Sequence, residues 1–114
     1  MSFPQRGEVY WVKLDPAVGS EIAKTRPAVI ISNDIGNQYA DRIIVAPISS
    51  GSIGKIYPFE VRLESSEGGL AQAFKVLLDQ IRTVDKSRLG NRIGALTPTR
   101  MEELNRAIKL SLAV

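Results

Sequence analysis

The chain of 114 residues contains neither cysteine nor histidine. Without cysteine it has no disulfide framework and no thiolate site, which is typical of proteins in a reducing compartment. Without histidine it lacks the side chain that most often serves as general base and as metal ligand. We therefore expect a protein that uses neither a metal ion nor a cofactor.

Long apolar runs are also missing. The N-terminal residues Met1–Arg6 lack the apolar core of a signal peptide, and no later run approaches the length of a membrane span. We expect a cytoplasmic protein without a membrane partner. The hydrophobic fraction of 44% and the charged fraction of 24% fit one globular domain over residues 1–114. The net charge of +3 allows a nucleic-acid partner without requiring one.

The most informative stretch is Thr25–Asn33, where a polar loop end runs into an apolar segment. Pro27 has a fixed φ and pushes the preceding residue toward extended geometry, so it should hold Arg26 at the mouth of a strand. A guanidinium is a permanently charged planar fork that suits phosphate or carboxylate. Arg26 is therefore a candidate anion-binding residue; the alternatives are a loop cap through carbonyl contacts and a surface ion pair.

The rest of the pattern is that of a small β protein. Apolar and β-branched residues predict strands in several segments. Asp79 and Gln80 interrupt the last of these apolar stretches, so it is either a strand pair or one bent strand. Between the strands we expect an exposed loop and a turn. The predicted strands are Gly7–Leu14, Ala28–Ser32, Ile43–Ile48, Pro58–Leu63, Phe74–Leu78 and Ile81–Val84; the loop is Ala17–Lys24 and the turn Asn33–Asn37.

A C-terminal amphipathic helix is the clearest element. Thr97 is placed as N-cap and Pro98 at the first helical position. Apolar residues then recur at spacings of three and four, namely Met101, Leu104, Ile108 and Leu112. Together with Leu89, Ile93 and Leu96, this stripe exceeds what one small barrel needs to cover, which predicts a two-fold homodimer.

No standard catalytic signature is present, but several segments together carry a resemblance. The chain resembles the MazF/PemK toxin family over essentially its whole length. The segments that carry the resemblance, in order, are Gly7–Val12, Leu14–Pro16, Gly19–Glu21, Arg26–Asn33, Pro47–Ser50, Tyr57–Val61 and Asp79–Arg82.

The resemblance implies an α+β protein that is mainly β: a small SH3-like antiparallel β-barrel with a C-terminal helix, the CcdB/PemK-like toxin fold. It implies a metal-independent endoribonuclease that cleaves single-stranded RNA, an mRNA interferase, as the toxin of a type II toxin–antitoxin system. Homodimerisation and a cognate MazE-like antitoxin, whose acidic segment competes with RNA, are also implied. The family's catalytic pair matches Arg26 and Ser49, with serine where the family more often has threonine.

Further site residues follow from the same match. Glu21 matches the loop acid, as base or as orienter of Arg26. The RNA contacts carry over to Ser20, Glu21, Asp79 and Gln80, with Tyr57 and Pro58 beside the groove and Ser50 next to the catalytic hydroxyl. Tyr57 could instead pack at the rim, and Asp79 and Gln80 could only mark a bulge. We expect Lys13, Lys24, Lys55 and Lys75 to be solvated charges; Lys24 and Lys55 flank the site and are candidate phosphate contacts.

These residue types fit the chemistry. Cleavage of RNA through its own 2′-OH needs in-line positioning, proton transfer and donors aimed at the developing charge. Two rival functions remain open: a gyrase-binding toxin of the same fold, and a catalytically silent RNA-binding barrel. Neither rival requires Arg26 and Ser49 to converge.

Overall fold

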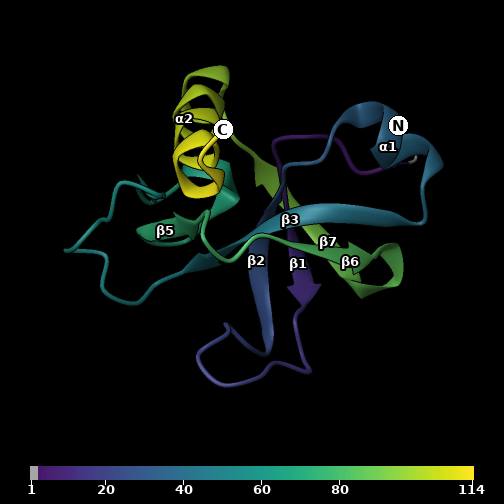
Figure 1. Cartoon of the computed structure of the whole chain (residues 1–114), viewed down its shortest axis with the longest axis horizontal. Coiled ribbons are helices and arrows are strands. Elements are labelled where there is room, and N and C mark those ends of the chain that lie inside the picture. Colours follow the sequence, from purple (N-terminus) through teal and green to yellow (C-terminus); the bar gives the residue numbers. More distant parts are fainter. Residues whose placement is uncertain (1–2) are drawn as a thin grey trace.

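The computed structural model describes residues 3–114. Seven strands and two α-helices follow one another along the chain (Figure 1). The strands are β1 (Glu8–Lys13), β2 (Thr25–Ile30), β3 (Arg42–Ser49), β4 (Glu60–Leu63), β5 (Phe74–Leu77), β6 (Arg82–Asp85) and β7 (Leu89–Ala95). The helices are α1 (Asp34–Tyr39), α2 (Pro98–Leu112) and two short 3-10 turns, η1 (Glu67–Gly69) and η2 (Lys86–Arg88).

All strand pairs are antiparallel. The strands follow the order β4-β5-β3-β2-β1-β7, and β6 pairs with β3 beside this path. The long strand β3 therefore has two partners along one edge: β6 along Arg42–Val45 and β5 at Ile48 and Ser49. The predicted architecture, mainly antiparallel β with a C-terminal helix, is confirmed.

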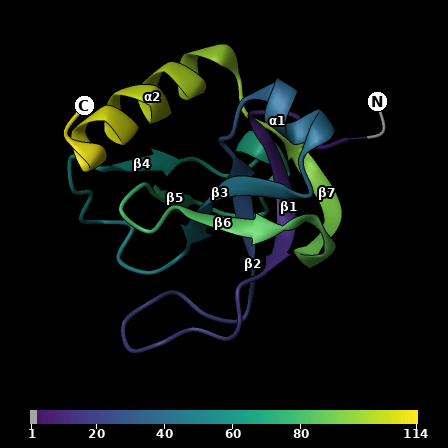
Figure 2. The same ribbon diagram turned by 45° about the vertical axis from the view of Figure 1, so that its right-hand side comes forward.

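The two faces of the sheet carry two separate apolar clusters. Alternate residues of a strand face opposite sides, so Val29 belongs to the first cluster whereas Ala28 and Ile30 belong to the second. The first cluster is completed by Leu104 and Ala107 of α2, which covers this face (Figure 2). The long loop between β1 and β2 lies at the opposite end of the molecule from α2.

The C-terminal helix begins as the sequence predicts. The Thr97 side chain accepts a hydrogen bond from the Arg100 N–H, and Pro98 occupies the first turn. Leu104 is fully buried, and Met101 and Ile108 pack against the core. Leu112 is exposed, so the last predicted member of the stripe does not face the sheet. Neither helix within residues 3–114 has the length and apolar content needed to cross a membrane.

Other local predictions need correction. The segment Asn33–Asn37 was predicted as a turn, but Asn33 caps the helix α1 and the buried Asn37 side chain is held by Ser32. The stretch on either side of Asp79 and Gln80 is not a hairpin, because β5 and β6 pair with β3 and not with each other. The alternative of one bent strand is the better description.

The strand β7 is absent from the predicted elements. Its partner is β1, with register shifts along the ladder. Close backbone approach explains its glycine content, since a Cβ on Gly94 would lie 2.5 Å from the Gly68 carbonyl oxygen. Leu89 and Ile93 pack against the two clusters and Leu96 is buried. Leu96 therefore serves the core of one chain, and Leu89 and Ile93, which are partly buried, leave less apolar surface for a dimer than the sequence predicted.

Candidate functional site

Arg26 and Ser49 lie at the ends of the two central strands. The ladder between β2 and β3 pairs Ala28 with Pro47. Continuing this register by two residues aligns Arg26 with Ser49. Directly opposed residues of an antiparallel pair have their side chains on the same face. The ladder itself ends at Ala28 and Pro47, so the shared face of Arg26 and Ser49, the one that carries the second apolar cluster, follows from extending its register.

Arg26 is half-buried and is held by its own loop. Its Nε donates to the carbonyl oxygen of Ala23 at 3.0 Å. The loop contact considered from the sequence is therefore present, whereas no carboxylate of residues 3–114 forms an ion pair with Arg26. The two terminal nitrogens have no hydrogen-bond partner within the same residues. One nitrogen fixes the guanidinium and the other two can still meet an anion.

Ser49 is the last residue of β3, and its hydroxyl is also oriented. Its Oγ accepts a hydrogen bond from the Gly51 N–H at 3.1 Å. A hydroxyl that accepts one hydrogen bond still has its own proton to donate. Ser49 can therefore act as a donor at a fixed position beside Arg26.

A cavity of about 600 Å³ opens between the β1–β2 loop and the chain around β6. It contains four of the predicted RNA contacts, Ser20, Glu21, Asp79 and Gln80. The rest of its lining consists of Ile22, Ile81, Arg82 and Thr83. Arg26 and Ser49 do not line this cavity. The predicted site thus has two parts, a catalytic pair and a separate polar cavity.

Hydrogen bonds to the chain's own backbone already occupy two of the cavity residues. The Gln80 Oε1 accepts from the Ile22 N–H at 2.7 Å, which ties the β1–β2 loop to the segment after β5. The Glu21 Oε1 accepts from the Val18 N–H at 2.6 Å within its own loop. Glu21 does not touch Arg26, so the structure does not place it as the orienter of that side chain.

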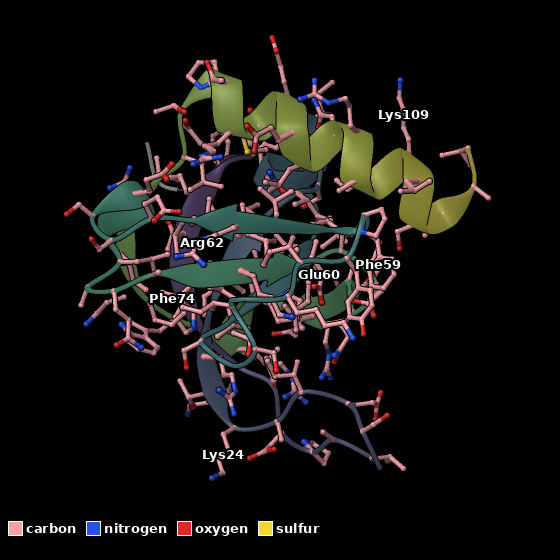
Figure 3. The ribbon with its side chains drawn as sticks, turned by 90° about the vertical axis from the view of Figure 1, so that its left-hand side faces the viewer. Lys24, Phe59, Glu60, Arg62, Phe74 and Lys109 are labelled. Carbon is pink, nitrogen blue, oxygen red and sulfur yellow. The ribbon has the colours of Figure 1, made fainter. Side chains whose placement is uncertain are left out.

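The remaining predicted contacts follow β3 or lie on the β1–β2 loop. Tyr57 stacks on Phe59 with ring centroids 5.5 Å apart, and the Lys55 Nζ lies 5.2 Å from the Tyr57 ring centroid. Ser50 is exposed at the start of the loop between β3 and β4. Pro58 lines a second cavity of about 360 Å³ between β4 and α2 and is not brought to the first. Lys24 is exposed on the side of the sheet away from Lys109 of α2 (Figure 3).

The sequence analysis missed two charged residues at the site, Lys75 and Glu60. Lys75 was predicted to be a solvated charge, but its ammonium pairs with Glu60 at 3.0 Å and each side chain is only 7% exposed. The alternation in Pro58–Leu63 places Glu60 on the less apolar face. A local pattern cannot predict that Glu60 pairs with Lys75, which lies 15 residues further along the chain. Arg82 was also missed; it lines the first cavity and donates to the Leu14 carbonyl at 2.9 Å.

Residues 3–114 contain no group of three or more acidic, cysteine or histidine side chains that could hold a metal ion. The expectation of metal-independent chemistry stays a prediction.

Comparisons with known proteins point to one family. Residues 5–112 match the family described as PemK-like, MazF-like toxin of type II toxin-antitoxin system. The chain is 44% identical over 111 residues to the Endoribonuclease MazF of Staphylococcus saprophyticus, covering 96% of this chain and 92% of that relative. It is 38% identical over 110 residues to the Endoribonuclease EndoA of Bacillus subtilis, covering 96% and 95%.

Solved structures of toxins with this description have the same fold. The crystal structure of MazF from Deinococcus radiodurans superimposes with a TM-score of 0.84 at 26% identity, covering 100% of both chains. An endoribonuclease from a mycobacterial species, solved in complex with its cognate antitoxin, gives a TM-score of 0.80 at 26% identity and covers 97% of this chain and 96% of that one.

Proposed function

This chain belongs to the PemK-like, MazF-like toxin family of type II toxin–antitoxin systems, and we propose that Arg26 and Ser49 are the residues with which it cleaves RNA as an endoribonuclease. The observation that supports the proposal is the register of β2 and β3: extended by two residues, it puts Arg26 opposite Ser49 on one face. Each is held by one backbone hydrogen bond and keeps donor groups available.

The nucleophile in this proposal is the 2′-OH of the RNA itself. Attack on the adjacent phosphorus breaks the bond to the 5′-oxygen of the next nucleotide, which takes up a proton from solvent and leaves as a 5′-hydroxyl, and the other product ends in a 2′,3′-cyclic phosphate. The guanidinium of Arg26 stabilises the charge that develops on the phosphorane oxygens. The Ser49 hydroxyl donates to the same group. Preorganised donors of this kind act on the transition state without reorganising during the reaction.

The proton of the 2′-OH needs an acceptor. Our candidate is Glu21, because one of its carboxylate oxygens is held by the Val18 N–H and the other has no partner within residues 3–114; the role requires the RNA to span both the cavity that Glu21 lines and the separate pair of Arg26 and Ser49. The carboxylate also lines the polar cavity of about 600 Å³, which offers room for a nucleobase beside Ser20, Asp79 and Gln80. Single-stranded RNA is recognised through splayed bases of this kind.

Partners and location belong to the same proposal. A mycobacterial relative has been solved with its cognate antitoxin, and we propose that this chain also binds a MazE-like antitoxin whose acidic segment competes with RNA for Arg26 and the exposed lysines near the site. Ser50, Lys24, Lys55, Tyr57 and Pro58 are proposed RNA contacts. The protein acts in the cytoplasm, where its RNA substrate is, and works as a homodimer.

The test is single-turnover cleavage of a structure-poor RNA whose cleavage site has been mapped. Arg26→Ala should lower the rate by about a hundredfold or more, the scale for removing one preorganised transition-state donor. Arg26→Lys should rescue little, because lysine keeps the charge but loses the planar fork. Ser49→Ala should also slow cleavage strongly, whereas Ser49→Thr keeps the hydroxyl and the activity.

Matched controls separate the site from general damage. Arg42→Ala changes an exposed arginine at the other end of β3, and Ser65→Ala changes an exposed serine; both should cleave like the wild type. Circular dichroism checks that every variant is folded. Cleavage should persist in EDTA. Wild-type rates in folded Arg26→Ala and Ser49→Ala would remove the pair from the mechanism and favour a binding module.

A further inference from the structure

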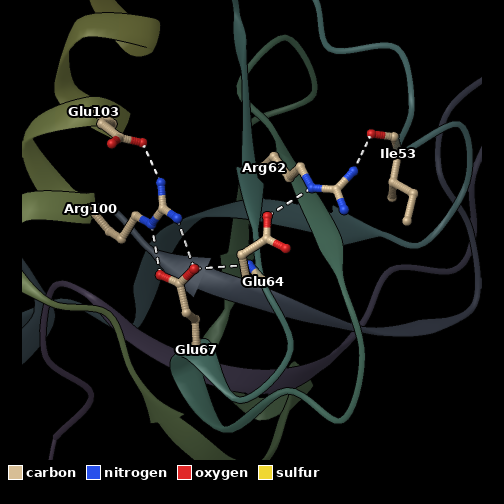
Figure 4. Close-up of polar contacts among 6 residues, drawn as sticks. All are labelled: Ile53, Arg62, Glu64, Glu67, Arg100 and Glu103. Atoms are coloured by element: carbon tan, nitrogen blue, oxygen red, sulfur yellow. Dashed lines mark hydrogen bonds and ion pairs between the residues drawn. The ribbon is translucent and has the colours of Figure 1, made fainter.

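Three charged side chains attach the loop between β3 and β4 to the sheet. The Lys75 Nζ donates to the Lys55 carbonyl at 3.3 Å, and the Glu60 Oε1 accepts from the Tyr57 N–H at 3.0 Å. Arg62 donates to the Ile53 carbonyl at 2.8 Å (Figure 4). The loop that contains Ser50, Lys55 and Tyr57 is thus fixed by side chains of β4 and β5.

The ion pair between Lys75 and Glu60 is unusual in its burial. Both side chains are 7% exposed and their charged atoms are 3.0 Å apart. Taking two charges out of water is costly, and apolar residues of similar volume often stabilise a protein as well or better. The burial of this ion pair is therefore weak evidence that it stabilises the fold. Both side chains also form hydrogen bonds to the backbone of the loop between β3 and β4, which indicates that they position this loop.

Lys75 also stands next to the catalytic serine. The β3–β5 ladder pairs its Cα with that of Ser49, and the β4–β5 ladder pairs it with Arg62. With Arg26 in register on the other side of Ser49, the four residues form one row across four strands, on one face. The proposed catalytic residues Arg26 and Ser49 and the loop-binding residues Lys75 and Arg62 therefore lie in the same row of cross-strand neighbours.

Tyr57 is the residue that this support orients. Its ring is stacked on Phe59 with an interplanar angle of 1°. The ammonium groups of Lys55 and Lys75 lie 5.2 and 6.0 Å from the ring centroid, within cation–π range. The side chain is still 43% exposed. An aromatic ring held in this way can stack on an unpaired base at little entropic cost.

We propose that Lys75 and Glu60 are positioning residues, which hold Tyr57 and Lys55 in place to bind the RNA nucleotide beside the phosphate cleaved at Ser49. The inference rests on the proposed function of Arg26 and Ser49. Neither Lys75 nor Glu60 touches the RNA; both act through the backbone of the loop between β3 and β4.

The test uses the double variant Lys75→Met/Glu60→Gln. It removes both charges together and leaves an amide oxygen that can still accept from the Tyr57 N–H. With the ammonium tether lost, the KM for the mapped RNA should rise by about tenfold, the scale of one base-stacking contact. The kcat should stay within about threefold, because Arg26 and Ser49 are untouched. An unchanged KM in the folded variant would overturn the proposal.

A double-mutant cycle distinguishes positioning from general destabilisation. If Lys75 and Glu60 act through Tyr57, then Tyr57→Ala alone should raise the KM, and adding Lys75→Met/Glu60→Gln should raise it no further. If the KM increases caused by Tyr57→Ala and by Lys75→Met/Glu60→Gln multiplied in the combined variant, the proposal would be overturned. The control Arg92→Met breaks a different ion pair, between β7 and Glu8 of β1, at the other end of the strand order from β4 and β5; it should lower the melting temperature without changing the KM.

A measurement on the unmodified protein covers the case of a variant that does not fold. The Tyr57 amide should exchange with deuterium more slowly than the Gly54 amide, which has no acceptor within residues 3–114. Equal exchange would contradict a fixed loop. The Arg26→Ala variant separates the two proposals: if it loses cleavage while Lys75→Met/Glu60→Gln keeps the wild-type KM, only the positioning role fails. If Arg26→Ala cleaves like the wild type, both fail.

Discussion

Arg26 shows how one side chain can be fixed and remain available. Its Nε is bound to the Ala23 carbonyl at 3.0 Å, so much of the rotamer entropy of a long side chain is lost on folding and not on RNA binding. Sequence reasoning identified the residue because Pro27 follows it. Sequence reasoning could not decide whether Arg26 caps its loop or binds an anion. In the structure the two roles do not exclude each other, because the cap uses only Nε and leaves the two terminal nitrogens for an anion.

Gln80 is the residue whose proposed role changes most. It was expected to contact RNA, yet its Oε1 already accepts from the Ile22 N–H at 2.7 Å. We predict that Gln80→Ala releases the β1–β2 loop, whereas Gln80→Glu keeps an acceptor at the same place. Amide exchange at Ile22 should quicken by roughly fivefold to tenfold in Gln80→Ala, the scale of one hydrogen bond, and change little in Gln80→Glu.

The control for this prediction is Gln72→Ala, which changes an exposed glutamine before β5. Its Ile22 exchange should equal that of the wild type. If Gln80→Ala left the Ile22 amide protected while altering which RNA sequence is cut, Gln80 would be a base reader and not a loop tether.

Among the elements, sequence reasoning succeeded where one strong local rule applied. The caps Thr97 and Pro98 set the start of α2, and alternation or apolar runs marked β1 to β4. It failed where tertiary contacts decide. The strand β7 contains two glycines and polar residues; close backbone approach explains the glycines, to η1 at Gly94 and to Trp11 of β1 at Gly90.

The helix α1 was missed for a related reason. Its sequence is rich in residues that favour turns, and the capping side chain of Asn33 and the buried Asn37 convert those residues into a helix. The pairing of Lys75 with Glu60 likewise joins two strands that are separated by a long connection. Periodicity gives the face of each residue but not its partner across the sheet.

Two elements, η1 and α2, are joined by one ion-pair network (Figure 4). Arg100 binds both carboxylate oxygens of Glu67, at 2.6 and 2.8 Å, and contacts Glu103 at 2.8 Å. The hydrogen bond from Arg100 is the main cause that lowers the pKa of Glu67, with the Glu64 N–H adding to it and burial opposing. The charged form of Glu67 is therefore favoured in the folded state.

This arrangement predicts a pH dependence of stability. Because the pKa of Glu67 is lower in the folded than in the unfolded protein, its contribution is complete above its ordinary value of 4.5 and is lost as the pH falls through the lowered folded value. Glu67→Gln should cost about 1 kcal/mol of unfolding free energy at neutral pH, the scale of a partly exposed ion pair. The difference from the wild type should shrink below pH 4.5.

Urea denaturation at neutral and acidic pH measures this difference. Glu102→Gln is the matched control. Glu102 is an exposed carboxylate on α2, the helix that carries Arg100, and it has no ion-pair partner within residues 3–114. Its effect should be small at both pH values. A Glu67→Gln deficit that persisted unchanged at acidic pH would show that packing, and not charge, accounts for the loss.

At the scale of the whole molecule, the proposed homodimer needs more apolar surface than Leu89, Ile93 and Leu96 leave exposed. Leu96 is buried, and Leu89 and Ile93 are partly buried against the two clusters. The exposed apolar residues of the last turn of α2 and its end remain, namely Leu110, Leu112 and Val114. We therefore place the dimer surface at this end of α2.

The prediction is a dimer with twice the chain mass of 12.5 kDa at micromolar concentration, measured by light scattering. In a two-fold interface the same patch occurs on both subunits, so one substitution acts twice. Leu112→Glu should shift the mass toward the monomer without unfolding the chain, because Leu112 is exposed. Ile35→Glu, at an exposed isoleucine of α1, is the control and should leave the mass unchanged. A monomeric wild type would overturn the dimer, whereas a dimer that survives Leu112→Glu but not Ile35→Glu would move the interface from α2 to α1.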